Sequence, residues 1–224
     1  MAETIGLARL RELLEEGVAL VEVLPAEEYE EEHLPGAVSI PLKTMDAKTV
    51  AGLDRSSPVV VYCWDELCDM SPRAACRLDT LGFETVYDYL PGKAEWLAHA
   101  LPTEGPGPDE PRIVDHVHDD VVTCGLSDRV GDIASRVEES PYRFALVVSE
   151  GGVVLGRLRG SAFEGDDGLS AEEAMEPGPS TMRPDISVEE AVKRLREREL
   201  RFGVVTRADG TLMGIFRRTD ADAG

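Results

Sequence analysis

Two cysteines lie in a short acidic loop that follows an apolar run, in the stretch VVVYCWDELCDMSPRAACRLDTLGF from Val59 to Phe83. A thiolate, and not a thiol, attacks sulfur or carbon electrophiles, so a reactive cysteine needs surroundings that favour negative charge. Backbone N–H groups at the start of a helix favour an anion. Cys63 ends the apolar run, and Ser71-Pro72 indicates a helix start. The pattern predicts a buried strand, a cradle loop and a helix.

Cys68 lies in the same loop and has two interpretations. It could resolve a persulfide or sulfenate on Cys63 by forming a loop disulfide. Its Cys-x4-Arg spacing to Arg73 could also make it the nucleophile, although the span from Cys68 to the end of the helix is too short. Cys76 and Cys124 are interpreted as packing residues, because free cysteines are among the most buried residue types.

The composition excludes some classes of partner. The net charge of -21 argues against nucleic acid or an anionic membrane, because both would be repelled. No apolar run approaches the length of a membrane span. The N-terminus has the pattern of an amphipathic helix and not of a secretory signal. We therefore expect a cytoplasmic protein whose thiols stay reduced.

The chain of 224 residues divides at the Pro- and Gly-rich segment LPTEGPGPDEP, residues 101–111. Before it, predicted strands at 20–24 and 59–62 alternate with predicted helices at 72–81 and 93–100. This alternation is typical of an α/β fold with a parallel sheet. We expect an N-terminal domain over 1–102, a linker over 103–120 and a C-terminal region over 121–224.

The C-terminal region contains an internal repeat, in which residues 123–162 align without a gap on residues 181–220. Each copy has the pattern strand, helix, strand, tight turn, strand. Ser127 and Ser187 are the predicted helix starts, the latter with Glu190 in capping-box position. The repeat predicts two α+β copies that pack as a pseudo-symmetric pair.

Three stretches of the first part resemble a rhodanese domain: LVEVLPAEEYEEEHLPGAVSIPL (20–42), the two-cysteine stretch, and VYDYLPGKAEWLAHALP (86–102). The resemblance places the persulfide-forming nucleophile at Cys63 and implies a sulfurtransferase of the thiosulfate or mercaptopyruvate type. Arg73 would orient an anionic substrate. The other residues of the loop would form its cradle, namely Trp64, Asp65, Glu66, Leu67, Asp69, Met70 and Ser71.

The sequence departs from the family pattern in three ways. Ser71 lies two positions later than usual, which implies a wider cradle. Glu22 and Leu24 replace the usual Asp and Arg of the opening strand, so we expect a structural charged contact to be lost. The loop acids should raise the pKa of a nearby thiol and repel thiosulfate.

The repeat resembles a tandem pair of cystathionine-β-synthase (CBS) domains. The resemblance rests on GPSTMRPDISVEEAVKRLRERELRFGVVTRADGTLMGIFRRTDAD (178–222) and PYRFALVVSEGGVVLGRLRG (141–160). It implies a homodimer and an adenosine-type regulatory ligand, such as AMP, ATP or S-adenosylmethionine, with no required cofactor. Ligand contacts by position in the family's Gly-x-x-Thr/Ser-x-x-Asp motif would be Gly156, Arg159, Gly214, Arg217 and Asp220.

The segment DHVHDD, residues 115–120, carries metal-ligand residue types, but its place beside the linker favours solvated side chains over a metal site. The leading hypothesis is a rhodanese-like sulfurtransferase or thiol-redox protein that the C-terminal pair regulates. Its expected partners are a small-molecule sulfur donor, a thiol acceptor and a partner protein. The alternative is an inactive regulatory scaffold with a ligand-sensing pair. The sequence leaves open which of these applies, and which donor, acceptor and nucleotide are used.

Overall fold

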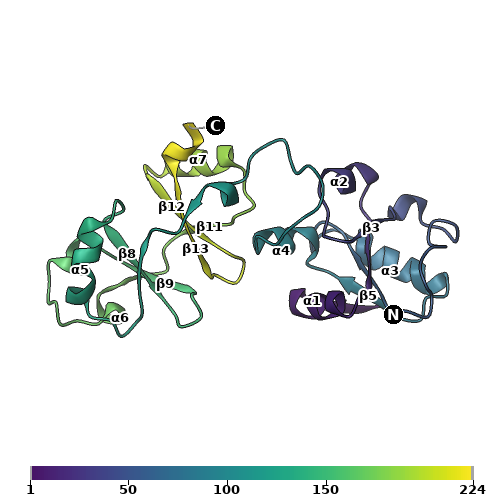
Figure 1. Cartoon of the computed structure of the whole chain (residues 1–224), viewed down its shortest axis with the longest axis horizontal. Helices are drawn as coiled ribbons and strands as arrows, with labels where there is room; N and C mark the ends of the chain where they lie inside the picture. The colour runs from purple at the N-terminus through teal and green to yellow at the C-terminus, as the bar shows by residue number, and fades with distance from the viewer. Residues whose placement is uncertain (1, 223–224) are drawn as a thin grey trace. The chain divides into compact units, whose positions relative to one another are not determined.

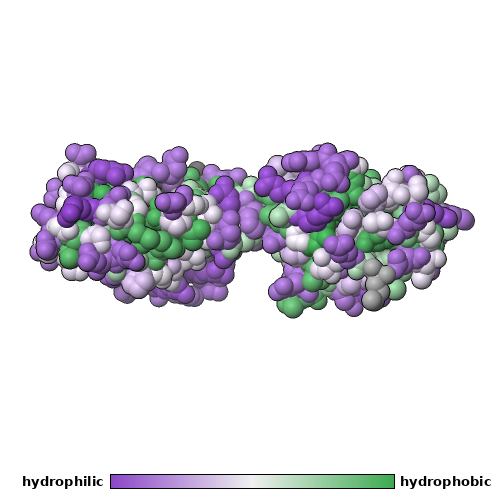
Figure 2. Space-filling view, turned by 90° about the horizontal axis from the view of Figure 1, so that it is seen from below, coloured by the Kyte–Doolittle hydropathy of each residue, from purple (hydrophilic) through white to green (hydrophobic). Residues whose placement is uncertain are grey.

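The computed structural model describes residues 2–222, which form two compact units divided between Asp109 and Glu110. Unit 1 is the N-terminal part and unit 2 the C-terminal part of the chain (Figure 1). Hydrophilic residues cover much of the face drawn in Figure 2, as expected for a strongly acidic chain. Among the described residues, no helix combines the length and apolar character that a membrane span requires.

Unit 1 is an α/β layer structure around a parallel sheet, as the sequence predicts. The sheet has the strand order β1-β5-β4-β2-β3, and each neighbouring pair is parallel. The elements in chain order are β1 (Glu3–Ile5), α1 (Leu7–Glu15), β2 (Ala19–Glu22), α2 (Ala26–Glu31), β3 (Val38–Ser39), the 3-10 turn η1 (Leu42–Thr44), β4 (Val59–Tyr62), α3 (Met70–Thr80), β5 (Val86–Tyr89) and α4 (Gly92–Ala98).

The two faces of this sheet carry separate apolar cores, because successive strand residues point to opposite sides. Val59, Val61 and Cys63 lie in one core with residues of α3. Val60 and Tyr62 lie in the other core, where α1 and α4 contribute apolar side chains. Buried on both faces, β4 consists of four fully enclosed residues, which explains its continuous apolar sequence.

The N-terminus differs from the sequence prediction. Glu3–Ile5 form the edge strand β1, and the helix begins only at Leu7. Glu3–Ile5 pair in parallel with Tyr87–Tyr89 of β5. The backbone groups at the edge of β5 thus provide hydrogen-bond partners for a strand, and local sequence periodicity does not reveal such distant partners.

Unit 2 contains two four-stranded sheets, with the orders β10-β9-β8-β7 and β11-β12-β13-β6. Its elements are η2 (Ile113–His116), β6 (Val117–His118), β7 (Val122–Cys124), α5 (Val130–Glu139), β8 (Phe144–Val148), β9 (Val154–Arg159), η3 (Gly160–Phe163), α6 (Ala171–Ala174), β10 (Glu176–Pro177), β11 (Thr181–Met182), α7 (Val188–Glu197), β12 (Phe202–Thr206), β13 (Leu212–Arg217) and η4 (Arg218–Asp222).

The two copies of the repeat adopt the same order of elements in the aligned register. The β8–β9 hairpin has a bulge after Val147, and the β12–β13 hairpin has one after Val205. The two hairpin turns bond to each other, through Val154 N to Gly210 O at 3.1 Å and Leu212 N to Gly152 O at 2.9 Å. A shared apolar core, which includes Leu146 and Ile215, fills the space between the copies.

The helix starts agree with the sequence in one copy only. Ser187 caps α7 and accepts a bond from Glu190 N at 3.2 Å. The other helix, α5, begins at Val130 with Arg129 at the N-cap, so Ser127 does not cap it. A complete capping box at Ser170, which the sequence pattern did not predict, starts the short helix α6.

Residues 103–120, expected to be a linker, take part in both units. Glu104 bridges to His33 in unit 1, with backbone N–H···O distances of 2.9 Å in both directions. Ile113 is fully buried in the core of unit 2, and β6 pairs with β13. The Pro- and Gly-rich segment contains the boundary between the units. The residues on either side of that boundary are held by contacts with residues distant in the sequence.

Candidate functional site

Cys63 lies directly after β4 and before the loop that leads into α3. Its side chain is fully buried. The start of α4 holds the backbone here, because Lys93 N donates to the carbonyl of Cys63 at 3.0 Å and Ala94 N to that of Trp64 at 2.8 Å. The carboxyl end of β4 and the first turn of α3 therefore both lie next to the sulfur of Cys63.

The polar contacts of the Cys63 thiol come from the loop and from α3. Sγ donates to Ser71 Oγ at 3.2 Å and to the carbonyl of Cys68 at 3.4 Å. The pKa of Cys63 is raised to about 11, mainly by burial and also by interaction with Cys68, while bonds from the Ser71 hydroxyl and backbone oppose the rise. The resting group is therefore a thiol at neutral pH.

Asp65 occupies part of the cradle with its own carboxylate. Its Oδ1 accepts bonds from the backbone amides of Leu67 and Cys68, both at 3.0 Å. Amides of this kind are the groups that would bind an anionic substrate in such a loop. The loop thus carries an internal anion where an external one would bind.

The remaining predicted residues of this site are placed differently. Ser71 is fully buried beside the thiol, whereas Cys68 is half-buried. Arg73 is exposed, and its guanidinium pairs with the Asp69 carboxylate at 3.4 Å. Arg73 therefore lies on the outer side of α3 and does not contact Cys63.

Two large apolar side chains of the loop are exposed to solvent. Leu67 is 88% exposed and Trp64 is 42% exposed. The Lys93 ammonium lies 5.9 Å from the centre of the Trp64 ring. Apolar groups at the entrance to a reactive group are more typical of a protein-binding surface than of a pocket for a small anion.

The expectation that Glu22 loses a charged contact is wrong. Glu22 and Lys93 form a fully buried ion pair at 3.0 Å, and Tyr62 OH donates to Glu22 at 2.6 Å. Lys93 also donates to the carbonyls of Glu28 and Glu32. Burial raises the pKa of Glu22, and its bonds to Tyr62 and Lys93 oppose that rise. The cation missing from position 24 is thus supplied by α4, a contact that strand sequence alone does not reveal.

In unit 2, a cavity of about 650 Å³ lies between the two copies and gathers arginine side chains. The arginines lining it are Arg143, Arg157, Arg159, Arg194, Arg198 and Arg201. Glu176 pairs with Arg157 and Arg159, and Glu190 pairs with Arg194. Arg157 Nε is buried and has no hydrogen-bond partner within the described residues. So much positive charge in so acidic a chain favours an anionic ligand.

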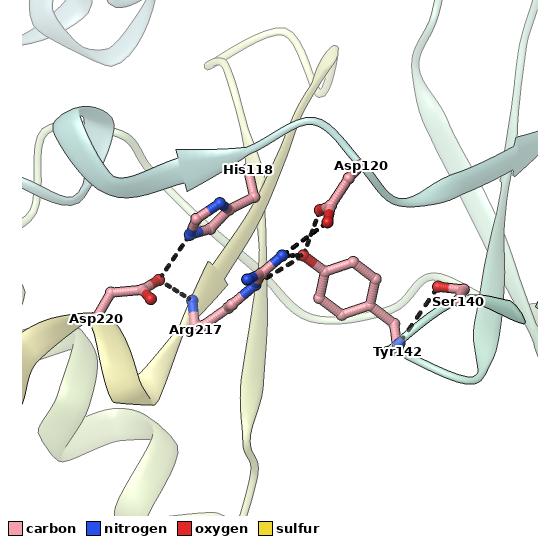
Figure 3. Close-up of polar contacts among 6 residues, drawn as sticks. All are labelled: His118, Asp120, Ser140, Tyr142, Arg217 and Asp220. Carbon is pink, nitrogen blue, oxygen red and sulfur yellow. Dashed lines mark hydrogen bonds and ion pairs between the residues drawn. The ribbon is translucent and has the colours of Figure 1, made fainter.

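Arg217 and Asp220 lie together in a different place, drawn in Figure 3. Asp220 accepts from Arg217 N at 3.0 Å and lies 3.1 Å from His118 Nε2. The Arg217 guanidinium bonds to Tyr142 OH and pairs with Asp120 at 2.7 Å. Both residues are therefore engaged by other side chains of unit 2.

Gly156 and Gly214, the other two predicted ligand residues, allow close approach of neighbouring segments. A Cβ at Gly214 would lie 2.1 Å from the carbonyl oxygen of His118, and one at Gly156 would lie 2.3 Å from the sulfur of Met175. Of the predicted ligand residues, Arg159 alone lines the arginine cavity.

The segment at residues 115–120 supplies two members of this cluster, His118 and Asp120. His118 contacts Asp220 in η4, and Asp120 contacts Arg217 in β13 and Tyr142, while both side chains stay partly exposed to solvent. Within residues 2–222, no group of three or more His, Cys, Asp or Glu side chains is arranged to hold a metal ion.

Comparisons with known proteins assign families to parts of both units. The model of the rhodanese-like domain matches residues 7–99, and the model of the CBS domain matches residues 171–221. The second match covers the second copy of the repeat and α6. The first copy has the same element order in the structure.

Two curated relatives match part of this chain. The HTH-type transcriptional regulator Rv0324 of Mycobacterium tuberculosis (strain ATCC 25618 / H37Rv) is 37% identical over 91 residues, or 41% of this chain and 39% of that protein. The putative sulfur carrier protein YrkF of Bacillus subtilis (strain 168) is 30% identical over 82 residues, or 37% of this chain and 43% of that protein. The chain spans less than half the length of each relative.

Among solved structures, CBSX2 in complex with AMP is 20% identical to this chain, with a TM-score of 0.44. The match covers 50% of this chain and 93% of that chain.

Proposed function

Because the chain contains a rhodanese-like domain followed by a CBS domain, we propose that it carries sulfur as a persulfide on Cys63 and that a nucleotide bound to unit 2 regulates this activity. The observation that carries the proposal is the position of Cys63 at the end of β4, bonded to Ser71 at the start of α3. A sulfur atom held there can attack the outer sulfur of a donor, and Ser71 can stabilise the thiolate.

The loop favours an organic or protein-bound persulfide over thiosulfate as the donor. Asp65 already bonds the amides of Leu67 and Cys68, so a small dianion would have to displace a carboxylate. Exposed Trp64 and Leu67 offer apolar contacts to a partner protein. The similarity to the putative sulfur carrier protein YrkF supports the same class of activity.

Intact-mass spectrometry of the reduced full chain tests this function. The protein is incubated with thiosulfate, with 3-mercaptopyruvate or with glutathione persulfide, and compared with Cys63→Ser and Cys68→Ser. We expect the gain of one sulfur atom, fastest from glutathione persulfide, and its loss in Cys63→Ser only. Cys76, interpreted from the sequence as a packing residue, is exposed instead, and Cys76→Ser serves as the control.

Each other outcome has a defined meaning. A gain that disappears only in Cys68→Ser would move the nucleophile to Cys68. No gain from any donor, in protein that remains folded by circular dichroism, would reject sulfur carriage and favour the regulatory scaffold.

The arginine cavity supports nucleotide binding as the regulatory part of the proposal. Arg143 and Arg201 occupy equivalent positions of the two copies and line the same cavity. Guanidinium groups bind phosphate through paired hydrogen bonds. We place the phosphate groups of an adenosine nucleotide here, and not beside Arg217 and Asp220.

Isothermal titration calorimetry with ATP and AMP tests this placement. We expect the double variant Arg143→Ala/Arg201→Ala to bind ATP at least about ten-fold more weakly, a loss of roughly 1.4 kcal/mol. Arg55→Ala, an exposed change in unit 1, should leave ATP affinity unchanged. Equal affinity in the double variant and the control would move the site elsewhere, and no binding at millimolar ATP would reject nucleotide regulation.

A further inference from the structure

A buried carboxylate lies next to the thiol site and is not used by the proposed function so far. Asp88 lies in β5, where it pairs with Val61 of the neighbouring strand β4. Paired residues of parallel strands point to the same face, and so do residues two apart along a strand. Asp88 therefore faces the side of the sheet on which Cys63 and α3 lie.

Ser71 connects the two acidic groups. Its hydroxyl accepts a bond from Cys63 Sγ at 3.2 Å, and it lies close enough to the Asp88 carboxylate to lower the pKa of that group. Cys63 and Ser71 are fully buried and Asp88 is 4% exposed, so no bulk water surrounds the chain of three groups. Asp88 Oδ1 has no hydrogen-bond partner among the residues that the structure describes.

An orphaned oxygen on a buried carboxylate is costly while the group is ionised, because a desolvated charge lacks compensation. Burial accordingly raises the pKa of Asp88, and it also raises that of Cys63. Both shifts disfavour the charged forms, and two adjacent buried anions would repel each other. One negative charge shared between Asp88 and Cys63 is the arrangement that this pocket tolerates best.

The single hydroxyl proton of Ser71 sets where that charge lies. When Ser71 donates to Asp88, its lone pairs accept the thiol proton and Cys63 stays neutral. When Ser71 donates to the sulfur, the thiolate is stabilised and the proton must reside on Asp88. These two states differ by the shift of two protons, one between Cys63 and Ser71 and one between Ser71 and Asp88.

We propose that Cys63, Ser71 and Asp88 form a proton relay, in which Asp88 accepts the thiol proton through Ser71 as the sulfur of Cys63 attacks its donor. This proposal rests on the proposed sulfur uptake for its biological role. Asp88 is a positioning residue here, because it acts on the sulfur through Ser71.

The step is balanced for a donor persulfide, R–S–SH. Cys63 sulfur bonds to the outer sulfur of the donor, the donor S–S bond breaks, and R–S⁻ leaves with its electron pair. The Cys63 proton passes to Ser71 while the Ser71 proton passes to Asp88. The products are Cys63–S–SH, R–S⁻ and neutral Asp88, with the same atoms and the same single negative charge as before. R–S⁻ and Asp88 then exchange the proton through solvent.

Alkylation of Cys63 by iodoacetamide tests the relay without requiring sulfur transfer. Rates are measured from pH 5 to pH 9 by mass spectrometry in the full chain and in Asp88→Asn, Ser71→Ala and Ser71→Thr. In the natural chain we expect the rate to be nearly flat above the titration of Asp88 and to fall below it. In Asp88→Asn and Ser71→Ala we expect a rate at pH 7 that is at least about ten-fold lower and rises with unit slope in pH.

The controls separate a relay from a structural role. Ser71→Thr keeps the hydroxyl and should retain the flat profile, whereas Ser71→Ala should lose it. Glu84→Gln changes an exposed carboxylate just before β5 and should match the natural chain.

An Asp88→Asn profile that follows the natural chain would overturn the relay, as would equal profiles for Ser71→Ala and Ser71→Thr. If Asp88→Asn does not fold, the two Ser71 variants decide the matter. Sulfur loading is measured in parallel. The expected alkylation profiles without any sulfur loading would retain the relay and reject the proposed function.

Discussion

At the scale of single residues, some features of the thiol site favour a negative charge and others disfavour it. The position of Cys63 beside the start of α3 favours an anion, whereas its burial and the acidic loop disfavour one. The side chain that decides the outcome for an external anion is Asp65, since it bonds the loop amides directly. Repulsion of an external anion by charge alone would instead come from Asp65, Glu66 and Asp69 together.

We predict that Asp65→Ala accelerates loading of sulfur from thiosulfate about ten-fold, because it frees two backbone donors and removes a nearby charge. Glu66→Ala removes the neighbouring charge while Asp65 keeps its bonds, so its rate should rise less. The measurement is the initial rate of mass gain under equal thiosulfate. Equal acceleration in the two variants would show that repulsion, and not occupation of the amides, limits the reaction.

The buried pair of Glu22 and Lys93 is a second decisive contact at this scale. We predict that Lys93→Met destabilises unit 1 by roughly 3–5 kcal/mol, because it leaves the Glu22 carboxylate buried without a cation. The measurement is urea unfolding followed by tryptophan fluorescence. Lys48→Met, at an exposed position, should change stability little.

The double variant Glu22→Gln/Lys93→Met should recover part of the loss, since it removes the uncompensated charge. A double variant as unstable as Lys93→Met would instead assign the loss to packing around the lysine stem.

At the scale of elements, the pseudo-symmetry of unit 2 gives a matched pair of glycines. Gly156 in β9 and Gly214 in β13 occupy equivalent positions of the repeat. Gly214 adopts a φ of 149° against the backbone of β6, whereas the three atoms nearest to a Cβ at Gly156 belong to the side chain of Met175. The same sequence position therefore has different tolerance in the two copies.

We predict that Gly214→Ala costs about 3 kcal/mol and Gly156→Ala about 1 kcal/mol of the unfolding free energy of unit 2. A Cβ at Gly214 must displace a paired strand, whereas Met175 can change rotamer. Chemical unfolding of both variants, followed by far-UV circular dichroism, provides the comparison. Equal losses, or a larger loss at Gly156, would contradict the assigned cause.

At the scale of the whole molecule, the net charge of -21 dominates the long-range electrostatics. Many acidic side chains are exposed, and like charges on a compact chain repel one another. Surface ion pairs such as that of Arg73 and Asp69 contribute little against this repulsion, because both partners are solvated.

We therefore predict that the melting temperature at pH 7 rises as NaCl increases from about 0.05 M to about 1 M, because the screening length shortens to roughly 3 Å. Chloride is chosen because sulfate would also strengthen apolar burial. KCl should give the same curve as NaCl. A melting temperature that falls with added salt would indicate that attractive ion pairs outweigh repulsion.

The pH dependence below neutrality follows from the carboxylates held by hydrogen bonds. Bonds from Tyr142 and Arg217 lower the pKa of Asp120, and bonds from Arg159 and Arg157 lower that of Glu176. A lowered pKa in the folded state contributes stability that is present above the unfolded pKa and lost as the pH falls through the folded one. These exposed groups therefore make a small contribution that disappears in acid.

The sequence by itself determined the architecture of both units and the location of the thiol site. The apolar run of β4, the helix signal at α3 and the ungapped repeat are local patterns, and periodicity and turn chemistry specify them without distant partners. The family resemblance to rhodanese and CBS domains rests on the same local motifs, and the family models match both.

Tertiary structure alone decided which side chains meet. Lys93 pairs with Glu22, Asp88 faces the side of the sheet that α3 covers, and Asp220 is engaged by His118. Each of these contacts joins residues far apart in the chain, so no spacing in the sequence encodes it. Asp65 is the exception, since its bonds to Leu67 and Cys68 are local, but the direction of its carboxylate depends on the loop conformation that the surrounding strand and helices impose.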